Sequence, residues 1–234
     1  MLSFLTKHSE ADVSDYLFKD RDDAARQLAQ RLKQLRLHRP LILAIPRGAI
    51  PMGAILAEEL HGELDVVLVH KLSAPSDPEY AIGAIDERGN RQLSMSFTLN
   101  DANRGWLEQQ AQQQLTVLRQ RRISYGGARA PADPTGRTVI VVDDGLATGA
   151  TMVAALRAVR SELPLALIAA IPVAAPQALQ LIAPLADRVV CLHAPMNFRA
   201  VSQHYKKFLQ VEEDEAIAAL RKHFAQQTGI SQNH

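Results

Sequence analysis

Residues 138–151, TVIVVDDGLATGAT, decide the fold of this chain. The stretch begins with five consecutive β-branched residues, which is typical of a short buried strand. Two adjacent carboxylates follow, and then a loop with two glycines and two threonines. Apolar residues next recur at the spacing of one helical face, at Met152, Ala155, Leu156 and Val159. The stretch therefore predicts a strand, an acidic pair, a Gly/Thr loop and a helix, in this order.

This order of elements suits a sugar phosphate. Backbone N–H groups at the start of a helix are unpaired and carry partial positive charge, so a loop that leads into the helix can hold a phosphate. Gly145 and Gly149 allow a close approach or a positive φ, and the hydroxyls of Thr148 and Thr151 can donate to the same anion. The two carboxylates can accept hydrogen bonds from vicinal ribose hydroxyls. Together these features predict a ribose 5-phosphate site.

Two other phosphate-binding loops are excluded. A Walker A loop requires lysine directly before its Ser or Thr, and the residue before Thr151 is Ala150. The dinucleotide-binding fingerprint has its acid about 20 residues after the glycines, whereas Asp143 and Asp144 precede the glycines here.

The stretch resembles the phosphoribosyl-pyrophosphate (PRPP) motif of type I phosphoribosyltransferases, which has a hydrophobic run, two acids and a Thr-Gly-x-Thr-type loop. The resemblance implies that Asp143 and Asp144 hold the ribose hydroxyls of PRPP. It implies a 5-phosphate site formed by Gly145, Leu146, Ala147, Thr148, Gly149, Ala150 and Thr151. The alternative is an ordinary strand-to-helix turn with two solvated aspartates, which would not require glycines and threonines at these offsets.

A second strand–loop–helix unit precedes this one. Residues 41–45 predict a strand, residues 46–51 a loop and residues 52–60 a helix. Arg47 offers a planar fork for phosphate oxygens, and Gly48 lets its backbone N–H approach them. In the resembling family the loop after the first core strand binds pyrophosphate, which implies this role for Arg47 and Gly48. The alternative is a turn in which Arg47 is only surface charge.

The next segment carries a candidate lysine and a candidate lid. Residues 64–69 predict a third strand, and the resembling enzymes often carry a basic residue after it that reaches the pyrophosphate, which implies Lys71. Residues 73–80 are rich in turn formers, and residues 81–86 and 92–99 predict a hairpin. In the family a flexible loop at this point closes over PRPP and excludes water. We therefore expect a flexible loop and β-ribbon at about residues 72–100.

The remaining pattern alternates strands and helices. Helices are predicted at residues 21–37, 103–122, 176–185 and 212–224, and strands at residues 165–171 and 188–192. This alternation predicts an α/β fold: a doubly wound, mostly parallel sheet with helices on both faces. Ligands bind such sheets beyond the carboxyl ends of the strands, where both candidate loops would lie.

Charged and aromatic residues outside the two loops have more ordinary explanations. Arg119, Arg121 and Arg122 are interpreted as surface charge at a helix end rather than as an anion or RNA site. Asp86 and Glu87 are interpreted as solvated loop carboxylates. The family resemblance implies a small hood at about residues 193–211, in which Phe198 is a candidate to stack on the acceptor base. Tyr205 and Phe208 are expected to pack within the hood core.

Composition places these features in one globular unit. The chain has 234 residues, of which 47% are hydrophobic and 22% charged, and a net charge of +1. We expect a single domain over residues 1–234 with no general attraction to nucleic acid or anionic membranes. A lone cysteine, Cys191, excludes an intrachain disulfide. The sequence shows neither a signal-peptide core nor an apolar stretch of about 18 residues, so a cytoplasmic location is expected.

The resemblance implies an enzyme that moves ribose 5-phosphate from PRPP to a nitrogenous base in nucleotide metabolism and releases pyrophosphate. It also implies Mg²⁺ bound through PRPP, and a homodimer. The sequence shows no zinc-type His or Cys motif. The segments 44–53 and 70–86 resemble bacterial members of the family whose acceptor is unassigned. Two alternatives stay open: a non-catalytic PRPP- or nucleotide-sensing regulator, and a PRPP or ribose-phosphate hydrolase.

Overall fold

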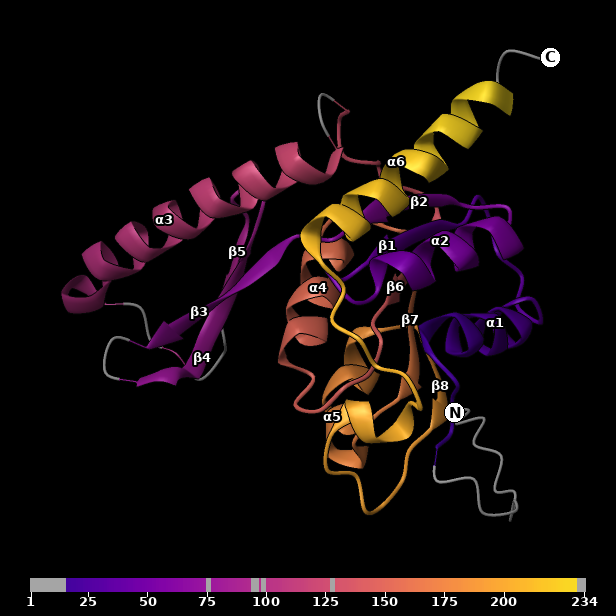
Figure 1. The fold of residues 1–234 in the computed structure, drawn as a ribbon. Coiled ribbons are helices and arrows are strands. Elements are labelled where there is room, and N and C mark those ends of the chain that lie inside the picture. Colours follow the sequence, from indigo (N-terminus) through magenta and orange to yellow (C-terminus); the bar gives the residue numbers. More distant parts are fainter. Residues whose placement is uncertain (1–15, 75–76, 94–96, 98–99, 127–128, 231–234) are drawn as a thin grey trace.

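In a computed structural model of the chain, the described residues are 16–74, 77–93, 97, 100–126 and 129–230. Five strands form a central sheet in the order β2-β1-β6-β7-β8 (Figure 1). They are β1 (Leu41–Ala44), β2 (Glu63–Val66), β6 (Thr138–Val142), β7 (Ala166–Val173) and β8 (Arg188–His193). All neighbouring strands in this sheet are parallel, so the predicted α/β class is confirmed.

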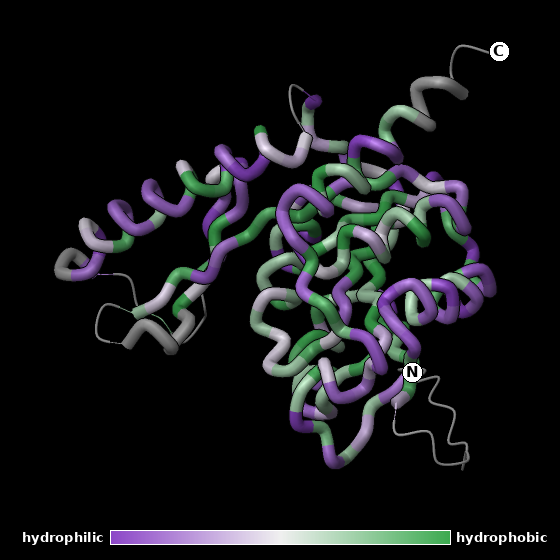
Figure 2. The backbone as a smooth tube through the Cα atoms, viewed as in Figure 1, coloured by the Kyte–Doolittle hydropathy of each residue, from purple (hydrophilic) through white to green (hydrophobic). Residues whose placement is uncertain are grey.

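Helices cover both faces of this sheet. On one face lie α1 (Arg21–Leu32), α2 (Ile50–Glu59) and α6 (Glu213–Ile230); on the other lie α4 (Ala150–Arg160) and α5 (Pro176–Ile182) with its 3-10 turn η1 (Ala183–Leu185). Successive strand residues point to opposite faces. Ile42 and Ile140 thus join the first hydrophobic cluster, whereas Leu43 and Val141 join the second. The central strands are accordingly among the most hydrophobic parts of the tube in Figure 2.

An arm projects from this body (Figure 1). It consists of a three-stranded antiparallel ribbon, β3 (Val69–Ala74), β4 (Asp77–Asp86) and β5 (Arg91–Leu93), and the long helix α3 (Asp101–Gly126). The predicted hairpin about residues 87–90 is confirmed as the β4–β5 connection, although residues 94–96, 98 and 99 of its second strand lie outside the described residues. The third strand is shorter than predicted, since β2 ends at Val66 and the chain then enters the ribbon.

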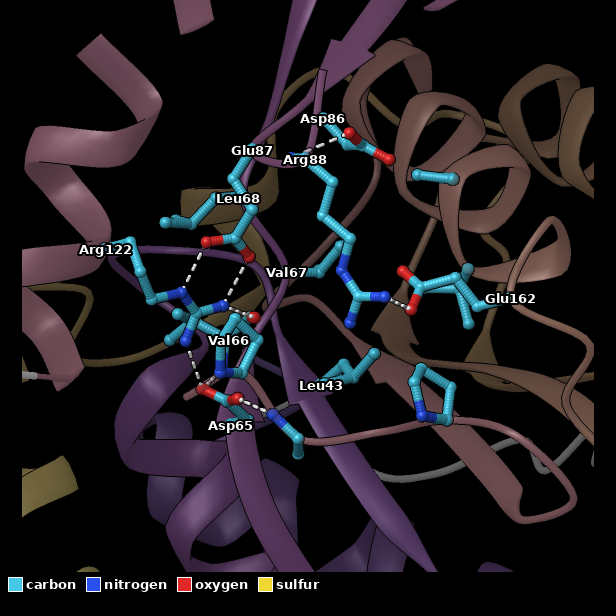
Figure 3. A pocket seen from close by; sticks show the side chains of 15 residues that line it. Leu43, Asp65, Val66, Val67, Leu68, Asp86, Glu87, Arg88, Arg122 and Glu162 are labelled. Atoms are coloured by element: carbon cyan, nitrogen blue, oxygen red, sulfur yellow. Dashed lines mark hydrogen bonds and ion pairs between the residues drawn. The ribbon is translucent and has the colours of Figure 1, made fainter. Parts of the chain in front are cut away.

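A buried ion cluster fastens the arm to the body (Figure 3). Arg122 on α3 donates from Nε and Nη2 to the carboxylate of Glu87, at 2.5 Å each, and from Nη1 to Asp65 on β2 at 2.6 Å. Burial of this guanidinium lowers its pKa, but the two carboxylates outweigh that effect and raise the pKa. The prediction that Arg122 is surface charge is therefore wrong.

The predicted solvation of two loop carboxylates is wrong as well. Glu87 belongs to the ion cluster, and its side chain is only 12% exposed. Asp86 is 5% exposed and accepts hydrogen bonds from the backbone N–H groups of Arg88 and Asn90 and from the Asn90 amide. Both acids stabilise the turn at the end of the ribbon.

Helix ends differ from the predictions where distant contacts determine them. Helix α1 ends at Leu32 rather than at residue 37. The following residues join the body, since the N–H of Thr138 donates to the His38 carbonyl and the N–H of His38 donates to the Thr138 hydroxyl. Helix α3 continues to Gly126 and buries Tyr125. Across the described segments, no helix is both long and apolar enough to cross a bilayer.

Candidate functional site

The two predicted ligand loops meet at the carboxyl ends of neighbouring strands. Ala44 on β1 is in register with Val142 on β6, and each strand leads directly into one of the loops. The Pro46–Arg47 peptide bond is cis. A Cβ atom on Gly48 would lie 2.2 Å from the Oδ2 atom of Asp144, so the first loop approaches the acidic pair as closely as only glycine allows. The structure thus brings Arg47, Gly48, Asp143 and Asp144 together.

Asp144 is held by an arginine that the sequence analysis did not select. The Nε and Nη2 atoms of Arg21, the first residue of α1, both lie 2.8 Å from Asp144 Oδ2. Arg21 Nη1 donates to the Leu209 carbonyl at 2.6 Å, and its guanidinium lies 3.8 Å from the centre of the Phe208 ring. Arg21 therefore joins Asp144 to the last residues of the hood.

The two acids differ in their electrostatic surroundings. Burial and then the neighbouring Asp144 charge raise the pKa of Asp143 well above 3.8. Burial also raises the pKa of Asp144, but the charge and hydrogen bonds of Arg21 oppose that effect. Asp143 Oδ1 accepts a hydrogen bond from the N–H of Asp144 at 2.9 Å. The neighbouring Asp144 charge therefore disfavours the ionised form of Asp143, whereas Arg21 favours the ionised form of Asp144.

The Gly/Thr loop leads into α4 as predicted. Gly149 is the residue before the helix and has a φ of 77°, a left-handed conformation that favours glycine. Ala147, Thr148, Ala150 and Thr151 are exposed beside this helix end. Its first backbone N–H groups have no partner within the helix, because of the helical hydrogen-bond pattern. This part of the loop has the donors that a phosphate needs.

The first residues of the same loop make backbone hydrogen bonds and packing contacts within the protein. Leu146 is buried, donates its N–H to the Val173 carbonyl and accepts from the N–H of Ala175. The N–H of Leu146, a predicted phosphate donor, is thus bonded to the Val173 carbonyl in this structure. A Cβ atom on Gly145 would lie 2.4 Å from Val201, so this glycine allows the hood to pack against the loop.

The hood contacts both the acidic pair and the loop that follows it. It includes the 3-10 turn η2 (Val201–His204), and the next residue, Tyr205, donates its hydroxyl to the Asp144 carbonyl at 2.6 Å. The Tyr205 ring packs against Phe18 and Phe208, with ring centres 5.1 and 5.0 Å apart, which confirms the predicted aromatic packing. Phe198 is half-buried and stacks on His204 at 5.3 Å, so one face of the candidate base platform is already covered.

The two candidate pyrophosphate cations come from different parts of the molecule. Arg47 is 38% exposed, and its Nη1 atom lies 3.9 Å from the carboxylate of Glu212, just before α6. Lys71 is exposed on β3, opposite Ala84, and therefore belongs to the arm rather than to the sheet. No group of three or more His, Cys, Asp or Glu suited to hold a metal is found within the described residues.

One sequence feature is consistent with the role of Arg21, although it does not identify the partner. Arg21 begins a helix whose flanking and following residues, Asp20, Asp22 and Asp23, are acidic. Acidic residues are favourable at a helix N-terminus and a cation is not. An arginine in this position therefore indicates a partner elsewhere in the fold.

Comparison with known proteins identifies the family. The model of the phosphoribosyl transferase domain matches residues 18–207. A protein named "Putative phosphoribosyl transferase Rv0571c", from Mycobacterium tuberculosis, is 40% identical over 210 residues, which cover 87% of this chain and 46% of the relative. The chain thus spans about half the length of this curated relative. The crystal structure of TT1426 from Thermus thermophilus has 42% identity and a TM-score of 0.81, and the match covers 88% of this chain and 98% of that one.

Proposed function

The chain belongs to the phosphoribosyl transferase domain family, and on that premise we propose that it transfers ribose 5-phosphate from PRPP to a nitrogenous base and releases pyrophosphate. One observation carries the proposal: the contact between Gly48 and the Asp144 carboxylate. It joins the candidate pyrophosphate loop to the candidate ribose acids. A sugar held by the acids would have its C1 substituent directed toward the first loop.

Each part of PRPP has a complementary group. The exposed backbone and hydroxyls of residues 147–151 would hold the 5-phosphate at the start of α4. Asp143 and the Oδ1 atom of Asp144 would accept hydrogen bonds from the ribose hydroxyls. Arg47, the N–H of Gly48 and, from the arm, Lys71 would contact the pyrophosphate.

The reaction exchanges one bond at C1 of the ribose. The bond from C1 to a pyrophosphate oxygen breaks, its electron pair leaves with pyrophosphate, and a lone pair of a base nitrogen forms the new bond. Positive charge develops on the sugar, and the nearby ionised Asp144 stabilises it. Arg47 stabilises the negative charge that develops on the leaving group. Holding both reactants in place supplies much of the remaining acceleration.

Magnesium fits the site as an ion that PRPP itself would bind. The site offers two carboxylates rather than the larger oxygen cage that a dedicated protein site requires. Mg²⁺ bound to the phosphate oxygens of PRPP would add positive charge at the leaving pyrophosphate. The acids would face such an ion through its water molecules or through the ribose.

We propose that the acceptor base binds on the hood side of the site. The hood over the acids is the place for a base, with Phe198 as a candidate stacking residue once its ring parts from His204. We further propose a cytoplasmic homodimer, the arrangement expected from the family resemblance.

A turnover assay tests the proposal. The purified chain is incubated with Mg²⁺, PRPP and each base of a panel of purines, pyrimidines and other nitrogen heterocycles, and pyrophosphate release is measured. We expect release that depends on one base and is lost in the double variant Asp143→Asn, Asp144→Asn. Release without any base would instead show a hydrolase, and PRPP binding without release for the whole panel would favour a sensor.

A further inference from the structure

We infer that Arg21 is a positioning residue of the ribose subsite, which fixes the Asp144 carboxylate and couples it to residues 208 and 209 of the hood. The inference rests on the proposed function, because the ligand of the subsite is the ribose of PRPP. It adds a residue from outside both ligand loops, 123 positions before Asp144 in the chain.

The geometry of the ion pair leaves one carboxylate oxygen available. Both donors of Arg21 contact the same atom, Asp144 Oδ2, and that atom also faces Gly48. Arg21 therefore occupies the oxygen that points to the first loop. Both contacts are to Oδ2, which leaves the other oxygen, Oδ1, to accept a hydrogen bond from a sugar hydroxyl. An unrestrained aspartate would lose this orientation through rotation of its side chain.

Burial strengthens the pair. The side chains of Arg21 and Asp144 are only 12% and 16% exposed, so water screens their attraction much less than it screens a surface pair. The groups that face Asp144 are Arg21 from α1, Asp143 from the end of β6 and the Tyr205 hydroxyl from the hood, which binds the Asp144 carbonyl. Arg21 is the cation among them, and it offsets the repulsion between the two acids.

The same guanidinium extends the coupling to the hood. Its third nitrogen binds the Leu209 carbonyl, and its plane lies on Phe208. Phe208 in turn packs on Tyr205. The side chain of Asp144 and its carbonyl are thus both tied to residues 205–209, through Arg21 and through Tyr205. A hood that moves when a base binds would move with the acid that holds the ribose.

A double-mutant cycle on PRPP affinity tests the inference. Affinity for Mg²⁺–PRPP is measured by calorimetry for the unaltered chain, Arg21→Gln, Asp144→Asn and the double variant. We expect about a tenfold loss for Arg21→Gln and a double variant no weaker than Asp144→Asn alone, because Arg21 acts through the carboxylate. Arg21→Lys, which keeps the charge but not the fork, should recover part of the loss.

The matched control is Arg160→Gln, which removes an arginine–aspartate pair with Asp187 at 2.9 and 3.1 Å at the opposite end of the strands. It should leave PRPP affinity unchanged. Equal affinity of Arg21→Gln and the unaltered chain, or additive losses in the double variant, would overturn the inference while the proposed function stands. Absence of PRPP binding by the unaltered chain would overturn the proposed function and the inference with it. Circular dichroism identifies any variant that fails to fold, and Arg21→Lys then supplies the comparison.

Discussion

At the scale of single residues, the candidate site contains two buried acidic side chains, which do not stabilise the fold. Asp143 and Asp144 are adjacent carboxylates at the end of a buried strand, and burial raises the pKa of each. Within the described ranges, a cation, Arg21, contacts Asp144 and not Asp143. Two buried adjacent carboxylates destabilise the folded state. Binding sites commonly retain such a destabilising arrangement because ligand binding requires it. Two substitutions follow from this view.

Asp143→Asn should stabilise the fold. Because the pKa of Asp143 is raised above 3.8 in the folded chain, the folded state holds this proton to higher pH than the unfolded chain does. The carboxyl therefore costs stability increasingly as pH rises through its folded pKa. We expect a gain of about 1 kcal/mol near neutral pH, which vanishes as the pH falls toward 4. Urea unfolding at several pH values measures it.

Asp187→Asn is the control with the opposite sign. Burial raises the pKa of Asp187, but hydrogen bonds from Arg160 and from the N–H of Leu167 outweigh it and lower the pKa. This carboxylate stabilises the fold above its unfolded pKa, so its replacement should reduce stability near neutral pH. A loss of stability in Asp143→Asn at neutral pH would contradict the assignment of Asp143 as a strained site acid.

Gly48→Ala should separate binding from folding. The new Cβ atom would meet Asp144 Oδ2 at 2.2 Å, and the carboxylate can yield because it is the end of a side chain. We expect a folded protein whose affinity for Mg²⁺–PRPP falls by at least about tenfold, since displaced acids no longer fit the ribose. Gly105→Ala on α3, where nothing lies within 4 Å of the new atom, is the control and should bind normally. Unchanged affinity in Gly48→Ala would refute the close contact of the two loops.

At the scale of elements, a cluster of buried charges links the arm to the body, in addition to the apolar residues that the arm contributes to the core. Asp65 on β2 is 3% exposed and accepts hydrogen bonds from Arg122 and from the N–H of Ala132. Glu87 links the same guanidinium to the ribbon. Strand β2 and the ribbon turn therefore both contact one arginine of α3. The close view in Figure 3 shows how Arg122 lies between these two acids.

Arg122→Met should destabilise the protein by about 3–5 kcal/mol, because two buried carboxylates lose their cation. Unfolding in urea, followed by circular dichroism, measures the effect. Arg119→Met, at an exposed position of the same helix, should change stability by less than about 0.5 kcal/mol. Equal effects of the two substitutions would show that the cluster does not hold the arm.

The sequence predicts elements well where local pattern and tertiary role agree. The β-branched run before Asp143 and the apolar spacing after Thr151 correspond to β6 and α4 within a residue or two. Prediction fails where contacts between distant parts of the chain determine where an element ends or what a side chain does. The end of α1 depends on the pairing of His38 with Thr138, 100 residues away. The role of Arg122 depends on Asp65, 57 residues away, and no local pattern encodes it.

At the scale of the whole molecule, the structure consists of the body and the arm. The doubly wound body brings the ligand loops to one end of its sheet, and the arm extends from the neighbouring strand β2 (Figure 1). The acids and the Gly/Thr loop are predictable because they lie in one continuous stretch, whereas Arg21 and Tyr205 come from opposite ends of the chain. Their contacts arise only from the complete fold.

If the arm closes over PRPP as a lid, ligand binding should protect it from exchange with solvent. We expect Mg²⁺–PRPP to slow amide hydrogen exchange in peptides that cover residues 69–93 and 143–152, while peptides from α5 exchange unchanged. Mass spectrometry of deuterium uptake measures this. Protection of the loop after β6 without protection of the ribbon would contradict closure of the arm, but it would still support PRPP binding at that loop.

The most direct test of the central claim is a calorimetric titration of Mg²⁺–PRPP into the unaltered chain and into the double variant Asp143→Asn, Asp144→Asn. Pyrophosphate alone serves as a second ligand, to show whether the ribose contributes. We predict saturable binding of PRPP to the unaltered chain and loss of that binding in a double variant that remains folded. Equal affinity of the two proteins for PRPP, or no binding to the unaltered chain, would contradict the claim that residues 143–151 form a PRPP site.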